Sequence, residues 1–110
     1  MAILAVVSGE QVIGEAIDPD GRRVVLLARV WDGKVLRDHA ELDGYLPDVL
    51  RAVHAPDHVE PDPTYELRRR FHLRGAGPSR WLLAVVSYEQ EPARIISAFG
   101  NRKDPRSWSA

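Results

Sequence analysis

The order of apolar and polar residues predicts strands toward both ends of this chain and helices in its middle. Residues 2–7 and 11–17 are rich in apolar and β-branched side chains, and residues 24–28 repeat that composition. Between the last two lies the tetrapeptide Asp-Pro-Asp-Gly (residues 18–21), in which proline fixes φ early in a turn and glycine accepts a positive φ. The first 30 residues therefore predict a β-meander.

A helical period replaces the strand pattern between residues 31 and 56. Trp31, Val35 and His39 lie at i, i+4 and i+8, which is one stripe of a short helix. Pro47 falls where a first-turn proline is tolerated, and Pro56 ends the second helix. The stripe of this second helix, at i, i+3, i+4 and i+7, consists of Leu46, Val49, Leu50 and Val53.

The remainder of the chain predicts strands again, over residues 58–60, 65–74, 81–86 and 93–99. The Gly-Ala-Gly-Pro sequence of residues 75–78 predicts a hairpin turn. Residues 81–86, from Trp81 onward, are apolar throughout and indicate a central strand covered on both faces. We therefore expect one α+β domain over residues 1–110, an antiparallel sheet with two short helices packed on one face, preceded by the N-terminal meander.

Composition narrows the function classes. Apolar residues make up 45% of the 110 and charged residues 28%, as in an ordinary globular domain. The absence of cysteine excludes disulfides, thiol catalysis and zinc–thiolate sites, and it fits a reducing compartment, so we expect a cytoplasmic protein. Residues 1–7 lack the basic leader of a signal peptide, and no apolar run has transmembrane length, so we expect no membrane partner.

The net charge of −1 conceals an asymmetry between the two halves of the chain. Residues 1–63 hold 6 Lys and Arg against 12 Asp and Glu, whereas residues 64–110 hold 9 against 4. A basic half is compatible with a local surface for RNA or for an acidic protein. The two halves can equally well pair with each other inside the fold.

The segment from Arg68 to Arg74 carries the strongest functional signal. As a strand it places Arg68, Arg70, His72 and Arg74 on one face, and Arg69, Phe71 and Leu73 on the other. A row of cations with one imidazole suits phosphate, which guanidinium groups bind in a bidentate way. The alternative is a solvated strand face whose charges discourage edge-to-edge pairing.

Several short motifs follow one another in the order found in one group of small nucleases. They are Asp38-His39-Ala40-Glu41-Leu42, Ala55-Pro56-Asp57-His58-Val59, Arg69-Arg70-Phe71, Gly77-Pro78-Ser79-Arg80-Trp81-Leu82, Val85-Val86 and Ile95-Ile96-Ser97-Ala98-Phe99. Over residues 31–106 the chain resembles bacterial and phage domains of the barnase–EndoU–colicin–RelE-like (BECR) nuclease and toxin group. That pattern has His-Pro-Glu-Leu where Ala40 replaces proline here, and a closing Thr-Ala-Tyr/Phe where Ser97 replaces threonine.

This resemblance implies metal-independent RNA cleavage by attack of the ribose 2′-hydroxyl, in a toxin neutralised by an antitoxin or immunity protein. Such cleavage needs a base, an acid and cations that stabilise the phosphorane. The candidate catalytic residues are His39, Arg70, His72 and Ser97, and the candidate substrate-binding residues are Arg68, Arg69, Arg74 and Arg80. Structural roles remain alternatives: a hydrogen-bonded His39 at the core edge, an exposed strand His72, and a Ser97 that joins strands.

Metal and cofactor sites are not expected. His54 and His58 have helical spacing, but Pro56 between them ends the helix. No glycine-rich phosphate loop precedes a helix, and no Gly-x-Ser-x-Gly elbow occurs. Three hypotheses follow: an RNase-like toxin, a catalytically inactive RNA- or protein-binding module on the same fold, and a homodimer in which the acidic half of one copy meets the basic half of another.

Overall fold

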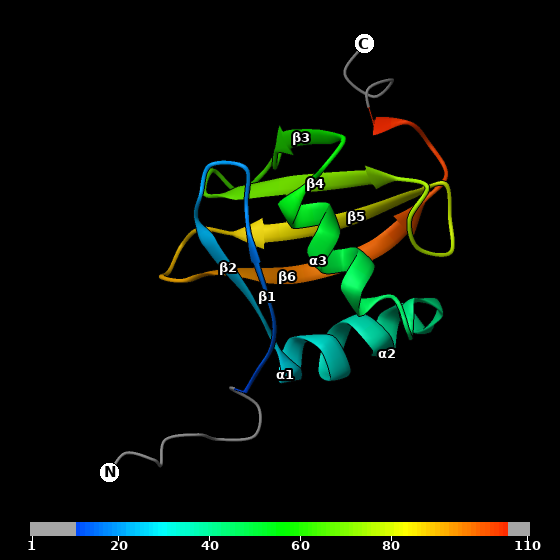
Figure 1. Cartoon of the computed structure of the whole chain (residues 1–110), viewed down its shortest axis with the longest axis horizontal. Helices are drawn as coiled ribbons and strands as arrows, with labels where there is room; N and C mark the ends of the chain where they lie inside the picture. The colour runs from blue at the N-terminus through cyan, green and yellow to red at the C-terminus, as the bar shows by residue number, and fades with distance from the viewer. Residues whose placement is uncertain (1–10, 106–110) are drawn as a thin grey trace.

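Residues 11–105, which the computed structural model describes, build a six-stranded sheet with short helices against it (Figure 1). The strand order is β1-β2-β6-β5-β4-β3, and the predicted α+β class is confirmed. The predicted strand over residues 2–7 lies outside the described part. The strands are β1 (Val12–Ile17), β2 (Arg23–Leu27), β3 (His58–Pro61), β4 (Arg68–Arg74), β5 (Trp81–Ser87) and β6 (Ala93–Asn101).

The sheet is mixed, whereas the sequence pattern predicts an antiparallel one. Strands β3 to β6 and the β1–β2 hairpin pair antiparallel, but β2 runs parallel to β6, through Val24–Ala93 and Val25–Arg94. A parallel pair needs a long crossover connection. The helices and the three strands between β2 and β6 form this crossover connection. The β1–β2 hairpin therefore packs on the free edge of β6 with β2 running parallel to β6.

The first helical segment follows β2 without a break and consists of α1 (Ala28–Val30), a π-helical turn (Trp31–Val35) and α2 (Leu36–Asp38). Trp31 and Val35 are buried, as their stripe predicts. The third member of that stripe, His39, lies just past α2 with non-helical φ and ψ of −137° and 65°. A short 3-10 turn, η4 (Ala40–Leu42), leads on toward α3.

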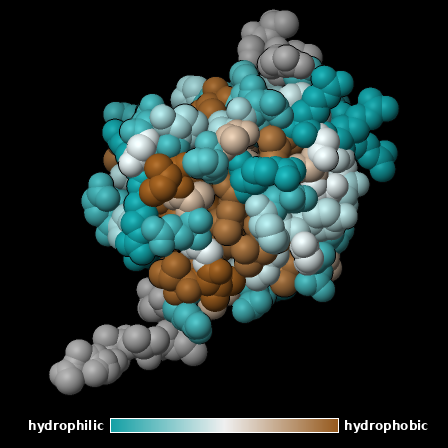
Figure 2. Space-filling view, in the orientation of Figure 1, coloured by the Kyte–Doolittle hydropathy of each residue, from teal (hydrophilic) through white to brown (hydrophobic). Residues whose placement is uncertain are grey.

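Helix α3 (Leu46–His54) covers one face of the sheet (Figure 1). Pro47 occupies its first turn and the helix ends before Pro56, as the sequence predicts. Phe71 and Leu73 of β4 point toward it, and β5 is buried along its whole length. The buried α3 residues that contact the sheet are Val49, Ala52 and Val53. Figure 2 shows apolar residues gathered on this side of the molecule, with hydrophilic residues around them.

The predicted turn at residues 18–21 is confirmed and is anchored by a buried carboxylate. Asp18 Oδ1 accepts the backbone N–H groups of Asp20 and Arg22, at 2.9 and 2.8 Å. Its Oδ2 accepts the hydroxyl of Tyr88 at 2.7 Å. Burial, with this hydrogen bond, raises the pKa of the Tyr88 hydroxyl far above its ordinary value. The contact fastens the β1–β2 hairpin to the residues that follow β5.

Within residues 11–105, no helix has both the length and the apolar composition needed to cross a bilayer.

Candidate functional site

The face of the sheet opposite α3 carries most of the residues singled out in the sequence. Directly paired residues on neighbouring strands project to the same side of a sheet. Strand pairing arranges this outer face in four rows: Arg74–Trp81–Asn101, His58–His72–Leu83–Phe99, Glu60–Arg70–Val85–Ser97 and Arg68–Ser87–Arg94. Arg70 of β4 and Ser97 of β6 therefore lie on either side of Val85 in the central strand β5.

Two of the three arginines that β4 places on the outer face are paired with carboxylates. The Nε of Arg68 lies 3.1 Å from Glu89 Oε2, and its guanidinium stacks 3.9 Å over the ring of Tyr65. The Nε of Arg70 lies 3.5 Å from Oδ2 of Asp62. Hydrogen bonds from two backbone N–H groups, with the nearby Arg70, hold the pKa of Asp62 below its ordinary value. Both cations are therefore largely neutralised within the fold.

Arg69 lies on the opposite face, away from Arg70. Its Nη1 donates to Asp20 Oδ2 at 2.8 Å, and its guanidinium lies 5.4 Å from the centre of the Tyr88 ring. The pair joins β4 to the β1–β2 turn. The structure therefore does not bring Arg69 together with the other candidate phosphate ligands.

His72 is enclosed, with 0% of its surface exposed. Its Nε2 lies 3.0 Å from Glu60 Oε2, and the ring of His58 lies 5.5 Å away. Burial lowers the pKa of the His72 imidazole, against the opposing effect of Glu60. A neutral, enclosed imidazole cannot touch a ligand, so His72 acts here as a buried link between β3 and β4. No group of three or more His, Cys, Asp or Glu side chains in residues 11–105 is arranged to hold a metal ion.

His39 lies at the other side of the outer face. Its ring stacks on Phe99 with centroids 5.5 Å apart, and its Nδ1 lies 3.5 Å from Glu41 Oε2. Its side chain is 36% exposed, in contrast to His72. Phe99 and His72 are two strands apart, which corresponds to about 10 Å at the usual strand spacing. The structure therefore does not place the two histidines on either side of one scissile phosphate.

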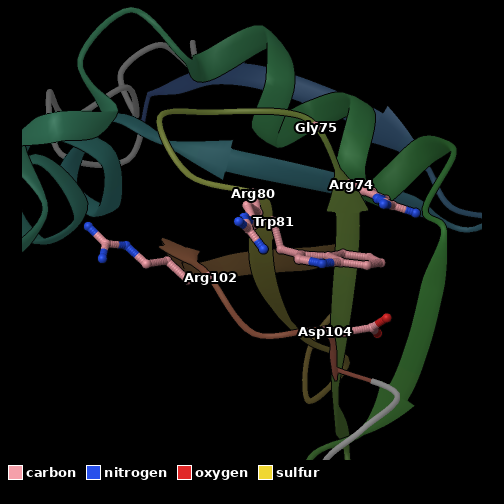
Figure 3. A pocket seen from close by; sticks show the side chains of 6 residues that line it. All are labelled: Arg74, Gly75, Arg80, Trp81, Arg102 and Asp104. Atoms are coloured by element: carbon pink, nitrogen blue, oxygen red, sulfur yellow. The ribbon is translucent and has the colours of Figure 1, made fainter.

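A cavity of about 460 Å³ opens at the end of the outer face, where β5 begins. Figure 3 shows Arg80 reaching toward the indole of Trp81, with Arg74 and Arg102 on either side of it. We call this cavity the arginine pocket; its lining residues are Arg74, Gly75, Arg80, Trp81, Arg102 and Asp104. A second hollow of about 600 Å³ adjoins it, lined by Arg80 and Arg102 again and by Pro78 and Ser79.

The three arginines of the pocket differ in their pairing from Arg68, Arg69 and Arg70. Arg74, Arg80 and Arg102 are exposed, and none of them forms an ion pair with a carboxylate within the described range 11–105. They come from three places in the chain: the end of β4, the start of β5 and the segment after β6. The lining of the cavity thus carries three guanidinium groups and a single carboxylate, that of Asp104. An excess of cationic side chains of this kind favours an anionic ligand.

Local structure holds the backbone of these arginines in place. The N–H of Gly75 donates to the carbonyl of Arg80 at 2.7 Å and closes the predicted hairpin turn. Positive φ values of 73° and 72° at Gly75 and Gly77 are reached cheaply only by glycine. Asp48 of α3 accepts the N–H of Gly77 at 3.3 Å, and Asp57 accepts the N–H of Arg74 at 2.8 Å. A backbone fixed in this way lowers the entropy lost when a ligand binds.

The sequence pattern predicts Arg74 and Arg80 as substrate-binding residues but does not single out Arg102. The signal lies in the strand register: Trp81 pairs with Asn101, the last residue of β6, so Arg102, which follows it, comes to lie beside Arg80. Trp81, assigned to the core, is indeed only 4% exposed, and the small remainder of its surface forms a wall of the pocket.

No family model, curated protein or solved structure matches this chain. The chemistry of the site is therefore inferred from its own residues.

Proposed function

We propose that this protein binds single-stranded RNA, with the arginine pocket as the anchor for a phosphate group. The observation that carries the proposal is that Arg74, Arg80 and Arg102 all line one cavity and that none of them is paired with a carboxylate of residues 11–105. Guanidinium groups make charge-assisted, bidentate hydrogen bonds to phosphate oxygens. Such contacts supply most of the affinity of proteins for nucleic acid backbones.

A single strand fits this surface better than a duplex. The cations lie at the end of an open sheet, and single-strand binding modules combine a sheet with a local positive groove. Neither α3 nor the first helical segment lines the arginine pocket, so no helix is placed there to enter a groove of a duplex. Because the net charge of the whole chain is −1, we expect RNA to bind at the arginine pocket and not over the whole surface.

Fluorescence anisotropy with a labelled single-stranded RNA tests the proposal at several salt concentrations. We expect the double variant Arg80→Ala/Arg102→Ala to bind more weakly, and its plot of log affinity against log salt to be shallower by about 0.7, which is the contribution of one phosphate contact. The matched control is Arg23→Ala, because Arg23 pairs with Glu15 on the β1–β2 hairpin. Affinity unchanged by the double substitution would contradict the proposal.

Metal-independent RNA cleavage is the second candidate, and the position of His39 favours it. His39 stacks on Phe99, one row along β6 from the Trp81–Asn101 pair of the pocket, so its exposed ring is close to an RNA anchored there. An imidazole near neutrality can accept the proton of a 2′-hydroxyl or protonate the leaving oxygen. In that case the protein acts in the cytoplasm as a toxin controlled by a neutralising antitoxin or immunity protein.

The cleavage assay uses a labelled RNA pool in EDTA. We expect products with 2′,3′-cyclic phosphate ends, formed by the wild type and lost in His39→Ala. The variant Arg37→Ala is the control, because Arg37 is exposed on α2, two residues from His39. Intact RNA after incubation with the folded wild type would exclude cleavage and leave the binding proposal in place.

A further inference from the structure

The arginines that line the arginine pocket are directed to different sides. In Figure 3, Arg74 and Arg102 point away from each other, with Arg80 and the Trp81 indole between them. Each of these two guanidinium groups therefore meets a different part of a bound chain. Arg102 points to the side of the view on which the ribbon of the first helical segment lies. An RNA chain that contacts Arg102 is thus directed toward that segment.

The first helical segment contacts β6 shortly before Arg102. Lys34 of its π-helical turn donates from Nζ to the carbonyl of Ile96 at 2.9 Å. Figure 1 shows α2 below the C-terminal end of β6, which is the end that Arg102 follows. His39, just past α2, stacks on Phe99, three residues before Arg102. Since a strand rises about 3.3 Å per residue, at most about 10 Å separates the backbone of Phe99 from that of Arg102.

His39 presents an aromatic ring at this position. Its plane lies 29° from that of the Phe99 ring, with centroids 5.5 Å apart, so Phe99 supports one face of the imidazole. The side chain of His39 is 36% exposed, and this exposed surface lies where Phe99 does not cover it. The carboxylate of Glu41, 3.5 Å from Nδ1, disfavours a phosphate beside this ring. An uncharged nucleobase meets no such repulsion, and bases stack on histidine as on other aromatic side chains.

From this geometry we propose that His39, supported by Phe99, stacks a base of the single-stranded RNA, next to the phosphate that Arg102 contacts. The site accepts any base, because every base has a π face. This inference rests on the proposed RNA binding and assigns the two parts of a nucleotide to two residues, the phosphate to Arg102 and the base to His39. Stacking needs an aromatic ring and no proton transfer, so it does not depend on cleavage.

The test compares a labelled single-stranded RNA with an abasic chain of the same length, which has the same sugars and phosphates but no bases. Both chains carry 2′-O-methyl groups, which prevent cleavage by the 2′-hydroxyl. Anisotropy gives the ratio of the two affinities, from which the phosphate contribution and its salt dependence cancel, because the chains have equal charge. We expect the wild type to prefer the chain with bases by about fivefold or more, the least that one stacked base supplies.

Three variants assign this preference to the ring of His39. His39→Ala removes the ring and should lower the ratio by about fivefold or more. His39→Phe keeps an aromatic ring that cannot transfer a proton, so the ratio should stay close to that of the wild type. The matched control is His54→Ala, which removes a histidine at the end of α3 that contacts the carbonyl of Ile17 on β1, and this variant should keep the wild-type ratio.

Proton NMR of the wild type gives a second readout, which does not depend on the folding of a variant with alanine. A base that stacks on the imidazole shifts the ring-proton signals of His39 through its ring current, and an abasic chain has no such ring. We expect these signals to move with the chain that carries bases and to move less with the abasic chain. The signals of His39 are those missing from the spectrum of His39→Phe.

The outcomes separate this inference from the proposed function. Equal affinity of the wild type for the two chains would overturn base stacking while RNA binding stands. A ratio that is unchanged in His39→Ala, or lost in His39→Phe, would overturn the assignment of stacking to the ring of His39. Failure of the wild type to bind either chain would overturn both proposals.

Discussion

A Cβ built on Gly100 would lie 2.8 Å from the Oγ of Ser79 and 3.1 Å from its Cβ. The loop that carries Arg80 thus rests directly on the backbone of β6, and only glycine leaves room for it there. Because Arg102 follows β6 by one residue, this close approach sets the spacing of the two arginines shared by both hollows. The geometry of the proposed phosphate site depends on a residue that carries no charge.

Gly100→Ala should therefore weaken RNA binding through position alone. The added methyl group must push Ser79 outward, which shifts Arg80 and costs about 1–3 kcal/mol of stability, as overpacking typically does. Anisotropy measures the affinity, and urea unfolding measures the stability. The control is Gly33→Ala, since a Cβ at Gly33 meets nothing within 4 Å and alanine is favoured within a helical turn. An unchanged affinity in Gly100→Ala would refute the positioning role.

The burial of His72 predicts a pH dependence of folding. Its pKa is lowered in the folded protein, so below about pH 6.5 the unfolded chain binds a proton that the folded one does not. The neutral His72 therefore makes its full contribution to the free energy of unfolding above about pH 6.5, and this contribution is lost as the pH falls toward the pKa of His72 in the folded protein. In His72→Gln, a side-chain amide can still donate to Glu60 but does not titrate.

Urea unfolding of both proteins from pH 8 to pH 5 checks this expectation. The free energy of unfolding of the wild type should fall more steeply below pH 6.5 than that of His72→Gln. The other three histidines are present in both proteins and cancel in the comparison. If the free energy of unfolding changed with pH in the same way in the wild type and in His72→Gln, His72 would take up a proton as readily in the folded protein as in the unfolded chain.

The hydrogen bond between Tyr88 and Asp18 predicts a local stability effect. Tyr88→Phe leaves Asp18 Oδ2 buried without its donor, which should lower the free energy of unfolding by about 1–3 kcal/mol. Tyr65→Phe serves as the matched control, because Tyr65 is exposed. Urea unfolding compares the two variants. RNA affinity should be the same in both, because neither residue lines the arginine pocket; equal stability losses would contradict the role of the hydrogen bond.

Local patterns predicted the elements of this fold because each is specified over a few residues. The turn at residues 18–21, the stripe of α3 and the apolar run of β5 all contain their own signals. The parallel pairing of β2 with β6 has no local signal, since it depends on which sheet edge remains free. His39 does not continue the helical stripe of Trp31 and Val35, because α2 ends at Asp38. Periodicity alone does not fix where a helix ends.

The candidate site was predicted in part, for a related reason. Alternation along β4 correctly placed Arg68, Arg70, His72 and Arg74 on one face. It could not reveal that Glu89 and Asp62, from other segments, neutralise two of these cations. Whether an arginine is available to a ligand depends on its tertiary neighbours, and the pattern of its own strand contains no information about them.

The ion pair between Arg70 and Asp62 leads to a prediction of increased affinity. In Asp62→Asn, the side-chain oxygen can still accept the N–H groups of Thr64 and Tyr65, now at 2.8 and 3.0 Å, but the charge facing Arg70 is gone. Arg70, which lies on the outer face between Arg68 and His72, then has no carboxylate partner and can contact RNA. Anisotropy should show tighter RNA binding and a salt dependence steeper by about 0.7, the contribution of one more phosphate contact.

The matched control for this gain is Asp20→Asn, which releases Arg69 on the opposite face. Both variants raise the net charge by one, so a general electrostatic attraction would strengthen binding equally in the two. If RNA follows the outer face from the arginine pocket, only Asp62→Asn should gain a contact, since Arg69 points away from that path. Equal gains would mean that the RNA is held by the overall field of the protein and not along this face.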